Sequence, residues 1–231
     1  VLWLLTDEHY KKVTGYEGDP YVRTQHLDRL AEKSVIFDNA VSPNPLCTPA
    51  RICMLTGKEA HHCSAYTNHW PVFPEHLTWP QHFSDNGYRT CLVGKMHLGG
   101  KNQMAGFQHR PYGDLRHGVG HQPDPIAKYP GYANVRSAGV TEIPETMLQD
   151  FVTARESLAF IREHADKEPE TPWFLCASFT RPHSPLTAPG RYIRRYRGKL
   201  PPVEKPPEES LYDSYEPYAR RFIEGFATRM T

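Results

Sequence analysis

The sequence predicts an α/β fold in which a mostly parallel sheet is flanked by helices on both faces. Short continuous apolar runs recur along the chain, and such runs are typical of strands buried on both sides of a sheet. Segments with helical spacing separate these runs, an alternation typical of parallel strands joined by crossover helices. Polar side chains follow several of the runs, at the sheet edge where open α/β sheets bind ligands.

The first fifty residues predict two strands and one helix. Val1–Thr6 is an apolar run that we interpret as a buried strand. Thr24–Lys33 begins with a favourable N-cap residue and carries apolar residues at helical spacing, so we expect a helix. A second strand is expected at Ser34–Ala40, and a loop at 41–46.

The remainder predicts two more helices and two more strands. Leu77–Asn86 reads as a helix that ends before a glycine, a residue favoured just past a helix C-terminus. The apolar run Arg89–Val93 follows as a strand. Thr146–His164 then predicts a helix, and Trp173–Phe179 a buried strand.

Three segments lack such patterns. Residues 101–144 are rich in glycine, proline, histidine and tyrosine, so we expect a loop-rich insertion that shapes a pocket. Pro201–Pro217 reads as a surface excursion, and 220–231 as part of a helix without a natural stop.

Composition excludes several classes of protein. The 231 residues suffice for one substantial core, and 27 basic against 26 acidic residues give no field that points to nucleic acid. Five cysteines form no regular framework, which argues against a disulfide-stapled module. No apolar run approaches the ~20 residues of a membrane span. The thirteen histidines offer many candidate ligands or proton carriers.

The most informative stretch is Pro45–Lys58, P-L-C-T-P-A-R-I-C-M-L-T-G-K. Thr48-Pro49 favours a helix start, because proline is tolerated in the first turn. Cys47 would then lie at a helix N-terminus, where unpaired N–H groups favour anions. Arg51, about one turn further on, adds a fixed charge on the same face. This is a plausible site for a tetrahedral oxyanion, although spacing alone leaves open a buried, inert Cys47.

C-T-P-A-R at 47–51, with L-T-G at 55–57, resembles the sulfatase signature Cys-x-Pro-x-Arg followed by Leu-Thr-Gly. The chain is thereby identified as similar to the N-terminal portion of a type I, arylsulfatase-like sulfatase of the alkaline phosphatase superfamily. The resemblance implies that fold, and oxidation of Cys47 to formylglycine by a formylglycine-generating or anaerobic maturation enzyme. The hydrate of that aldehyde is the nucleophile in the family.

The acidic pair Asp7 and Glu8 follows the first predicted strand. By itself, such a pair is most often a solvated turn. The resemblance implies that Asp7, together with the nucleophile at 47, binds calcium or another divalent cation. Glu8 departs from the Asp or Gln more frequent at the second position, so metal ligation, substrate contact and neither role all stay open for it.

Two further motifs match the family in the correct order. G-K-M-H-L-G at 94–99 resembles Gly-Lys-x-His-Leu-Gly, which implies that Lys95 and His97 lie in the sulfate pocket. P-H-S-P at 182–185 resembles Pro-His-x-Pro, whose histidine, here His183, contacts the sulfate ester.

Other polar residues carry less weight. Asn68 lies where some relatives have a substrate-contacting asparagine. His61, His62 and Cys63 form a polar group after the predicted helix, and we interpret them as a loop, because no second Cys/His pair lies at zinc-site spacing.

The resemblance implies hydrolysis of a small sulfate ester. The hydrated residue 47 attacks sulfur, while Arg51, Lys95 and the cation stabilise the charged oxygens. His183 or Lys95 assists the leaving oxygen, and His97 takes the proton from the second hydroxyl. Two alternatives stay open: a phosphonate monoester or phosphodiester hydrolase of the same superfamily, and a non-catalytic binding protein with this fold.

The sequence also predicts a fragment. The first residue, Val1, opens directly into a strand, and the D-N-G triplet at 85–87 precedes the position of the family's late metal-binding motif. We therefore expect an N-terminal part of the catalytic domain (1–231) that lacks the remaining metal ligands, has an uncovered sheet edge and is inactive alone. Homo-oligomerisation stays open, as does the compartment, cytoplasmic or periplasmic for a bacterial protein.

Overall fold

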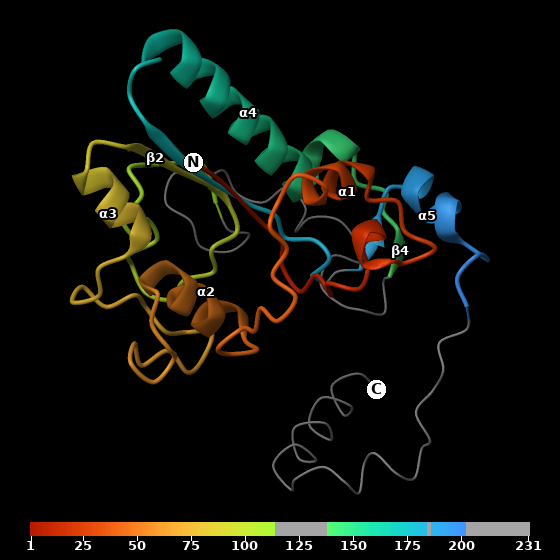
Figure 1. Cartoon of the computed structure of the whole chain (residues 1–231), viewed down its shortest axis with the longest axis horizontal. Helices are drawn as coiled ribbons and strands as arrows, with labels where there is room; N and C mark the ends of the chain where they lie inside the picture. The colour runs from red at the N-terminus through yellow and green to blue at the C-terminus, as the bar shows by residue number, and fades with distance from the viewer. Residues whose placement is uncertain (114–137, 184–185, 202–231) are drawn as a thin grey trace, which may run out of the picture. The chain divides into compact units, whose positions relative to one another are not determined.

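The structure, a computed structural model, describes residues 1–113, 138–183 and 186–201. The chain divides into two compact units, Val1–Arg195 and Tyr196–Thr231. The sheet, the helices that cover it and the candidate site all belong to the first unit (Figure 1).

A four-stranded parallel sheet forms the centre of this unit. In spatial order its strands are β1 (Leu2–Leu5), β5 (Trp173–Ser178), β2 (Arg89–Gly94) and β3 (His109–Tyr112). Leu5 of β1 and Gly94 of β2 both pair with Ser178 of β5. The carboxyl ends of these three strands are therefore level, and the residues that follow them meet at one edge of the sheet.

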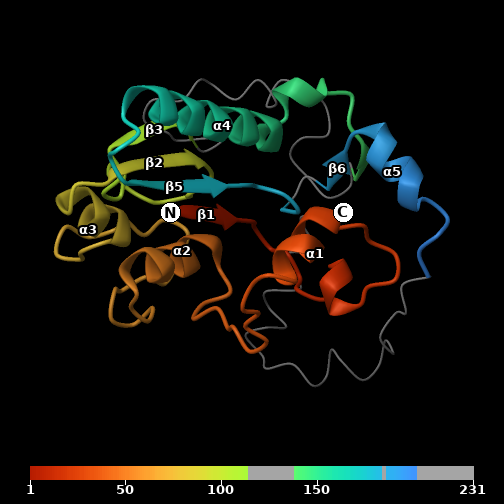
Figure 2. The same ribbon diagram turned by 45° about the horizontal axis from the view of Figure 1, so that its top comes forward.

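Helices cover both faces of the sheet, as predicted (Figure 2). The long helix α4 contacts β2, β3 and β5 on one face, whereas α3 contacts β2 and α2 on the other. The helices are α1 (Gln25–Ala31), α2 (Cys47–Thr56), α3 (Trp79–Asp85), α4 (Gln149–Lys167) and α5 (Gly190–Tyr196). Short pieces complete the unit: η1 (Gly15–Glu17), η4 (Glu145–Met147), and β4 (Gly139–Val140) paired with β6 (Thr187–Ala188).

The core lies in two layers, one on each face of the sheet. Successive strand residues point to opposite faces, so Leu92 packs with Ile52 of α2 while its neighbour Val93 packs with Phe160 of α4. Both layers need apolar residues, which explains why β2 and β5 read as continuous apolar runs.

The predicted strand at Ser34–Ala40 is wrong, because the structure has turn and irregular backbone there. Val35 and Phe37 are 80% and 78% exposed. Strand-forming residues need a neighbouring strand and a covered face to be stabilised as a strand, and among the described residues none pairs with this segment.

Two short strands, β3 and β4, lie within the expected loop-rich insertion at 101–144 and were not predicted. β3 contains Pro111, whose missing N–H is tolerated because β3 is an edge strand. Helix α5 was not predicted. Residues 114–137 of the insertion, and the segments at 202–217 and 220–231, lie outside the described residues.

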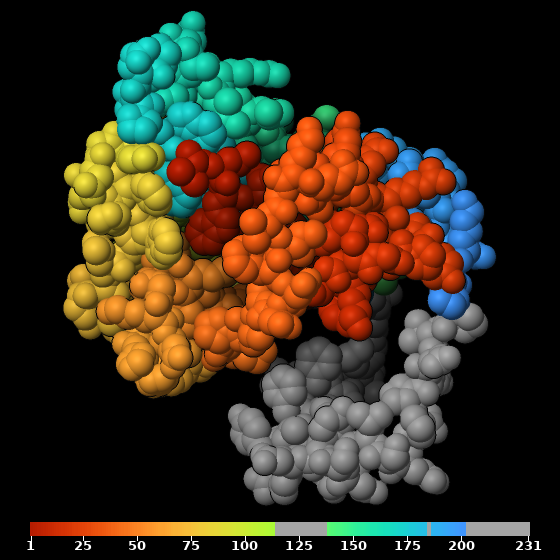
Figure 3. Space-filling model, viewed as in Figure 1, coloured from red at the N-terminus to blue at the C-terminus, as the bar shows by residue number. Residues whose placement is uncertain are grey.

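β1 forms the other edge of the sheet within the described part of the chain. Leu2 and Leu4 are 47% and 52% exposed, and the red N-terminal residues reach the surface in Figure 3. The expected uncovered edge is thus present among these residues, whereas the extent of the natural protein stays a prediction. None of the described helices combines the length and apolarity that a membrane span requires.

Gly94, at the carboxyl end of β2, gives a test of this packing. Its φ is +93°, and an added Cβ would lie 2.1 Å from the carbonyl oxygen of Ser178. We expect Gly94→Ala to lower the free energy of unfolding by about 3 kcal/mol or more in urea denaturation. Gly87→Ala, at φ +79° with open space around it, should cost only about 1–2 kcal/mol. Equal losses for both variants would contradict the close approach of β2 and β5.

Candidate active site

The site is built around the first turn of α2, which begins at Cys47. The N–H of Thr48 donates to Oδ1 of Asn68 at 3.0 Å, and the Thr48 hydroxyl donates to the backbone oxygens of Asn68 and His97. Pro49, which lacks an N–H, costs nothing at this position. These contacts of Thr48 with Asn68 and His97, which lie on two separate loops, hold the start of α2 and the position of residue 47.

A buried ion cluster lies beside this helix start. Oδ2 of Asp7, just beyond β1, accepts from Nη2 of Arg51 at 2.9 Å and lies 2.6 Å from Nζ of Lys95. Nη1 of Arg51 also donates to the Lys95 carbonyl at 2.7 Å and to Oγ of Ser178 at 3.0 Å. The cluster ties α2 to the carboxyl ends of β1, β2 and β5.

The cluster holds more positive than negative charge. Burial by itself would raise the pKa of Asp7, but the charges and hydrogen bonds of Lys95 and Arg51 outweigh burial and lower this pKa below its ordinary value. Asp7 is therefore ionised, and one carboxylate faces two cations. A buried excess of positive charge favours binding of a further anion.

Cys47 lies next to this excess charge. Its Sγ is 3.8 Å from Nζ of Lys95 and 3.9 Å from Oδ1 of Asp7. Hydrogen bonds from His183 and His97 lower the pKa of the Cys47 thiol to about 6, against the opposing effect of burial and with help from the charge of Lys95. The surroundings of residue 47 thus stabilise negative charge there.

Glu8 and His183 complete the group. Nε2 of His183 lies 3.7 Å from Oε1 of Glu8. Atoms of Asp7, Glu8, Cys47 and His183 all lie within 4.8 Å of one another, so this set could hold a metal ion. The two carboxylates suit a divalent cation, but they supply fewer oxygens than the six to eight that calcium usually takes.

Two residues of the group have strained backbones. Glu8 and His97 have φ values of 52° and 54°, in the left-handed region that non-glycine residues seldom adopt. Such conformations cluster at functional sites, where surrounding contacts hold them.

Six residues were expected to converge from separate segments, and the structure brings all of them together: Asp7, Cys47, Arg51, Lys95, His97 and His183. Glu8 lies in the same group, beside His183. Their individual roles stay predictions. Asn68 lies at the same place, with its side-chain oxygen engaged by the Thr48 N–H. Glu59, His61 and His62 form a separate exposed group on the loop after α2.

Sequence reasoning missed Ser178 and the contacts of Thr48. Ser178 is fully buried and accepts a hydrogen bond from Arg51. A polar residue that ends the apolar run of β5 was the available signal. Thr48-Pro49 was expected to begin the helix, but Thr48 occupies an undefined position of the signature, and nothing local to it indicates contacts with Asn68 and His97.

A cavity of about 430 Å³ adjoins the segment that carries His183. Arg181, Pro182, Phe151 and Tyr192 are among its lining residues. The carboxylate of Asp150 accepts the N–H groups of Thr180 and Arg181 and so fixes this segment. Its lining residues include neither Cys47 nor Lys95, so the ion cluster is not part of this cavity.

Residue 47 thus lies at a helix N-terminus, beside a carboxylate held by two cations. The family model described as Sulfatase matches residues 1–222. The chain therefore belongs to the sulfatase family, which confirms the predicted resemblance.

The chain is also similar to individual curated proteins and solved structures. The ulvan-active sulfatase of Formosa agariphila is 28% identical, and the match covers 100% of this chain and 44% of that protein. Among solved structures, Ps i-CgsB in complex with k-i-k-neocarrahexaose aligns with a TM-score of 0.68 at 22% identity, over 87% of this chain and 49% of that one. The phosphonate monoester hydrolase of Agrobacterium radiobacter aligns with a TM-score of 0.67 at 22% identity, over 89% and 44%.

These comparisons confirm the predicted fold class. They also show that the chain spans less than half the length of the curated relatives it matches first, at 44%, 40% and 40%.

The environment of Cys47 predicts unusual reactivity in the unoxidised protein. The thiolate is the form that reacts with iodoacetamide, so the alkylation rate should rise with pH through a midpoint near 6 and level off by neutral pH. His183→Ala removes the largest stabilising contact and should raise the midpoint, whereas His76→Ala, on the loop before α3, should not. Peptide mass spectrometry would follow the rate at residue 47, and a midpoint near the ordinary 9.0 would contradict the described geometry.

Proposed function

We propose that this chain forms the nucleophile-bearing part of a sulfuric ester hydrolase. The observation that carries the proposal is the surroundings of residue 47: a helix N-terminus, hydrogen bonds from His183 and His97, and Nζ of Lys95 at 3.8 Å. A group at this position is held among donors and positive charge, as an acceptor of a negatively charged sulfuryl group requires.

We infer that Cys47 is oxidised to formylglycine by a maturation enzyme acting on the unfolded or nascent chain. The hydrated aldehyde would supply two hydroxyl groups on one carbon, one for attack and one for release of sulfate. A thiol has no second oxygen, so an unmodified Cys47 could not complete this cycle. Family membership and the match at 47–51 support this modification.

Lys95 and Arg51 have different electrostatic roles in this proposal. Nζ of Lys95 faces residue 47, so Lys95 is the cation that contacts the charged oxygens of the ester. The Arg51 side chain is 3% exposed and bonded to Asp7 and Ser178. Arg51 therefore acts chiefly as a positioning residue that keeps Asp7 ionised and α2 in place.

His183 and His97 are the proton-transfer groups in this proposal. His183 lies beside Glu8 at the open side of the group, so it is placed to assist the leaving oxygen of the ester. His97 contacts residue 47 and is held through its backbone oxygen by Thr48, so it is placed to take a proton from residue 47. Asn68 contributes by fixing the helix start, and contact of its amide with substrate stays part of the proposal.

Asp7 and Glu8 would hold a divalent cation, calcium by family resemblance, with residue 47 as a neighbouring ligand. Such an ion would supply Lewis-acid polarisation of the ester and of the attacking group. The carboxylates themselves keep Lys95 and His183 oriented toward residue 47.

Turnover by the whole protein, matured in a host with the modifying machinery, tests the proposal. We expect hydrolysis of a chromogenic aryl sulfate, loss of this activity in Cys47→Ala, and an intact mass at residue 47 that has lost sulfur and two hydrogens and gained oxygen. His183→Ala should lower kcat by about 10²- to 10⁴-fold, whereas the control His76→Ala, on the loop before α3, should not change it.

The outcomes separate the alternatives. A matched phosphonate monoester or phosphodiester hydrolysed faster than the sulfate would assign the other hydrolase class. A folded, correctly matured protein that turns over none of these esters would indicate a non-catalytic binding protein. Full activity in Cys47→Ala would exclude covalent catalysis at this site.

A further inference from the structure

Two buried cysteines that the proposed reaction does not use lie in contact. Cys53 is on the second turn of α2, and Cys63 is on the segment that follows this helix. Their side chains are 4% and 0% exposed, and their Sγ atoms are 3.9 Å apart within one core cluster.

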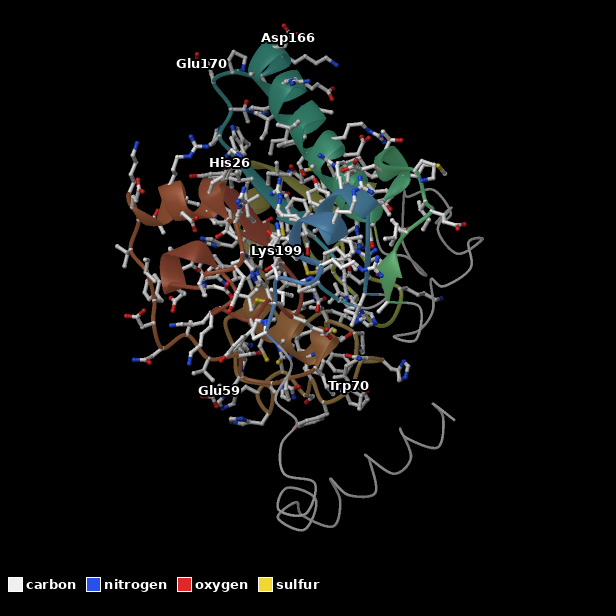
Figure 4. All side chains as sticks on the ribbon, turned by 90° about the vertical axis from the view of Figure 1, so that its right-hand side faces the viewer. His26, Glu59, Trp70, Asp166, Glu170 and Lys199 are labelled. Carbon is white, nitrogen blue, oxygen red and sulfur yellow. The ribbon has the colours of Figure 1, made fainter. Side chains whose placement is uncertain are left out.

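The segment that contains Cys63 runs back along α2. We call residues 57–68 the return segment. At one end, the N–H of Gly57 donates to the Cys53 carbonyl at 2.8 Å. At the other end, Asn68 accepts from the Thr48 N–H in the first turn of α2. Figure 4, in which Glu59 and Trp70 are labelled, shows this part of the chain beside α2.

We propose that Cys53 and Cys63 form a disulfide that cross-links α2 to the return segment and so braces the helix that carries residue 47. A disulfide needs the two sulfur atoms about 2 Å apart. The sulfurs already touch, so a side-chain rotation and a small shift of the return segment, rather than of the helix, would close the gap.

The chemistry requires an oxidant, for which a small disulfide such as oxidised glutathione suffices. One cysteine thiolate attacks the small disulfide, which gives a mixed disulfide and releases one small thiol. The second protein thiolate attacks the mixed disulfide and releases the other small thiol. The protein loses two hydrogens, and its two electrons reduce the oxidant.

Access of the oxidant to the Cys53 and Cys63 thiols controls when the disulfide forms. Burial raises the pKa of the Cys53 thiol to about 11, so the folded protein holds little of the reactive thiolate. The return segment itself is exposed at Glu59, His61 and His62, so its local opening would admit an oxidant. We therefore expect efficient closure during folding and slow closure in the folded protein.

The remaining core cysteines do not offer the same reaction. Leu92, not Cys91, pairs with Cys176 across β2 and β5. Cys91 and Cys176 therefore point to opposite faces of the sheet, and they belong to different core clusters.

Tryptic cleavage provides a direct test on the whole protein. Cleavage after Arg51, Lys58 and Arg89 places Cys53 on peptide 52–58 and Cys63 on peptide 59–89, each with a single cysteine. The protein is refolded with oxidised glutathione, alkylated and digested without reductant. We expect the two peptides as one linked species that reduction separates.

Matched variants make the test specific. Cys63→Ser should abolish the linked species, whereas Cys91→Ser should retain it. Refolded protein with both peptides alkylated, with only glutathione adducts on them, or with links to Cys91 or Cys176 would overturn the proposal.

The bracing effect is measured separately by hydrogen exchange. In the oxidised protein, amides of residues 52–68 should exchange more slowly than in the reduced protein, because the cross-link restricts opening of the return segment. The comparison uses one sequence, so it does not depend on whether a variant folds. Equal exchange rates in the oxidised and reduced protein would contradict the proposal that the disulfide braces α2. Both readouts are independent of turnover, so failure of the proposed hydrolase would leave them unaffected.

Discussion

The geometry of the candidate site depends on one buried carboxylate. Asp7 accepts from Arg51 at 2.9 Å and lies 2.6 Å from Lys95. Asp7 follows β1, Arg51 is in α2 and Lys95 follows β2, so the three residues come from segments far apart in the sequence. Removal of one partner from such a buried group leaves an uncompensated charge, which is strongly destabilising. The same contacts place Lys95 beside residue 47, so stability and the proposed chemistry share one set of interactions.

Much of the fold was accessible from the sequence because β2 and β5 are covered on both faces, whereas β1 is apolar but leaves Leu2 and Leu4 exposed. β1, β2 and β5 read as continuous apolar runs, and the helices between them carry apolar residues at helical spacing. Ser34–Ala40 has the same kind of residues but lacks a partner strand among the described residues, so its composition led to a wrong strand prediction. The edge strand β3 was missed because its four residues lie in a segment whose glycine, proline, histidine and tyrosine content is typical of a loop. Its Pro111 is compatible with a strand because β3 is at the edge of the sheet.

The site was accessible to the extent that its residues lie in contiguous motifs. Cys47, Lys95 and His183 follow from such motifs, and the structure brings them together. Ser178 depends on strand register, since it meets Arg51 only because β5 ends level with β1 and β2. Contacts between segments of this kind have no local signal in one sequence. The Cys53–Cys63 contact likewise becomes visible only when the return segment is seen along α2.

In the proposed function, residue 47 lies in a preformed site for a sulfate-like oxyanion. The most direct measurement is protection of unoxidised Cys47 from alkylation by neutral iodoacetamide. Sodium sulfate should slow alkylation in a saturable manner, sodium chloride at equal ionic strength should not, and Lys95→Ala should lose the protection. Equal rates in the two salts, with Cys47 otherwise reactive, would contradict an oxyanion site at the start of α2.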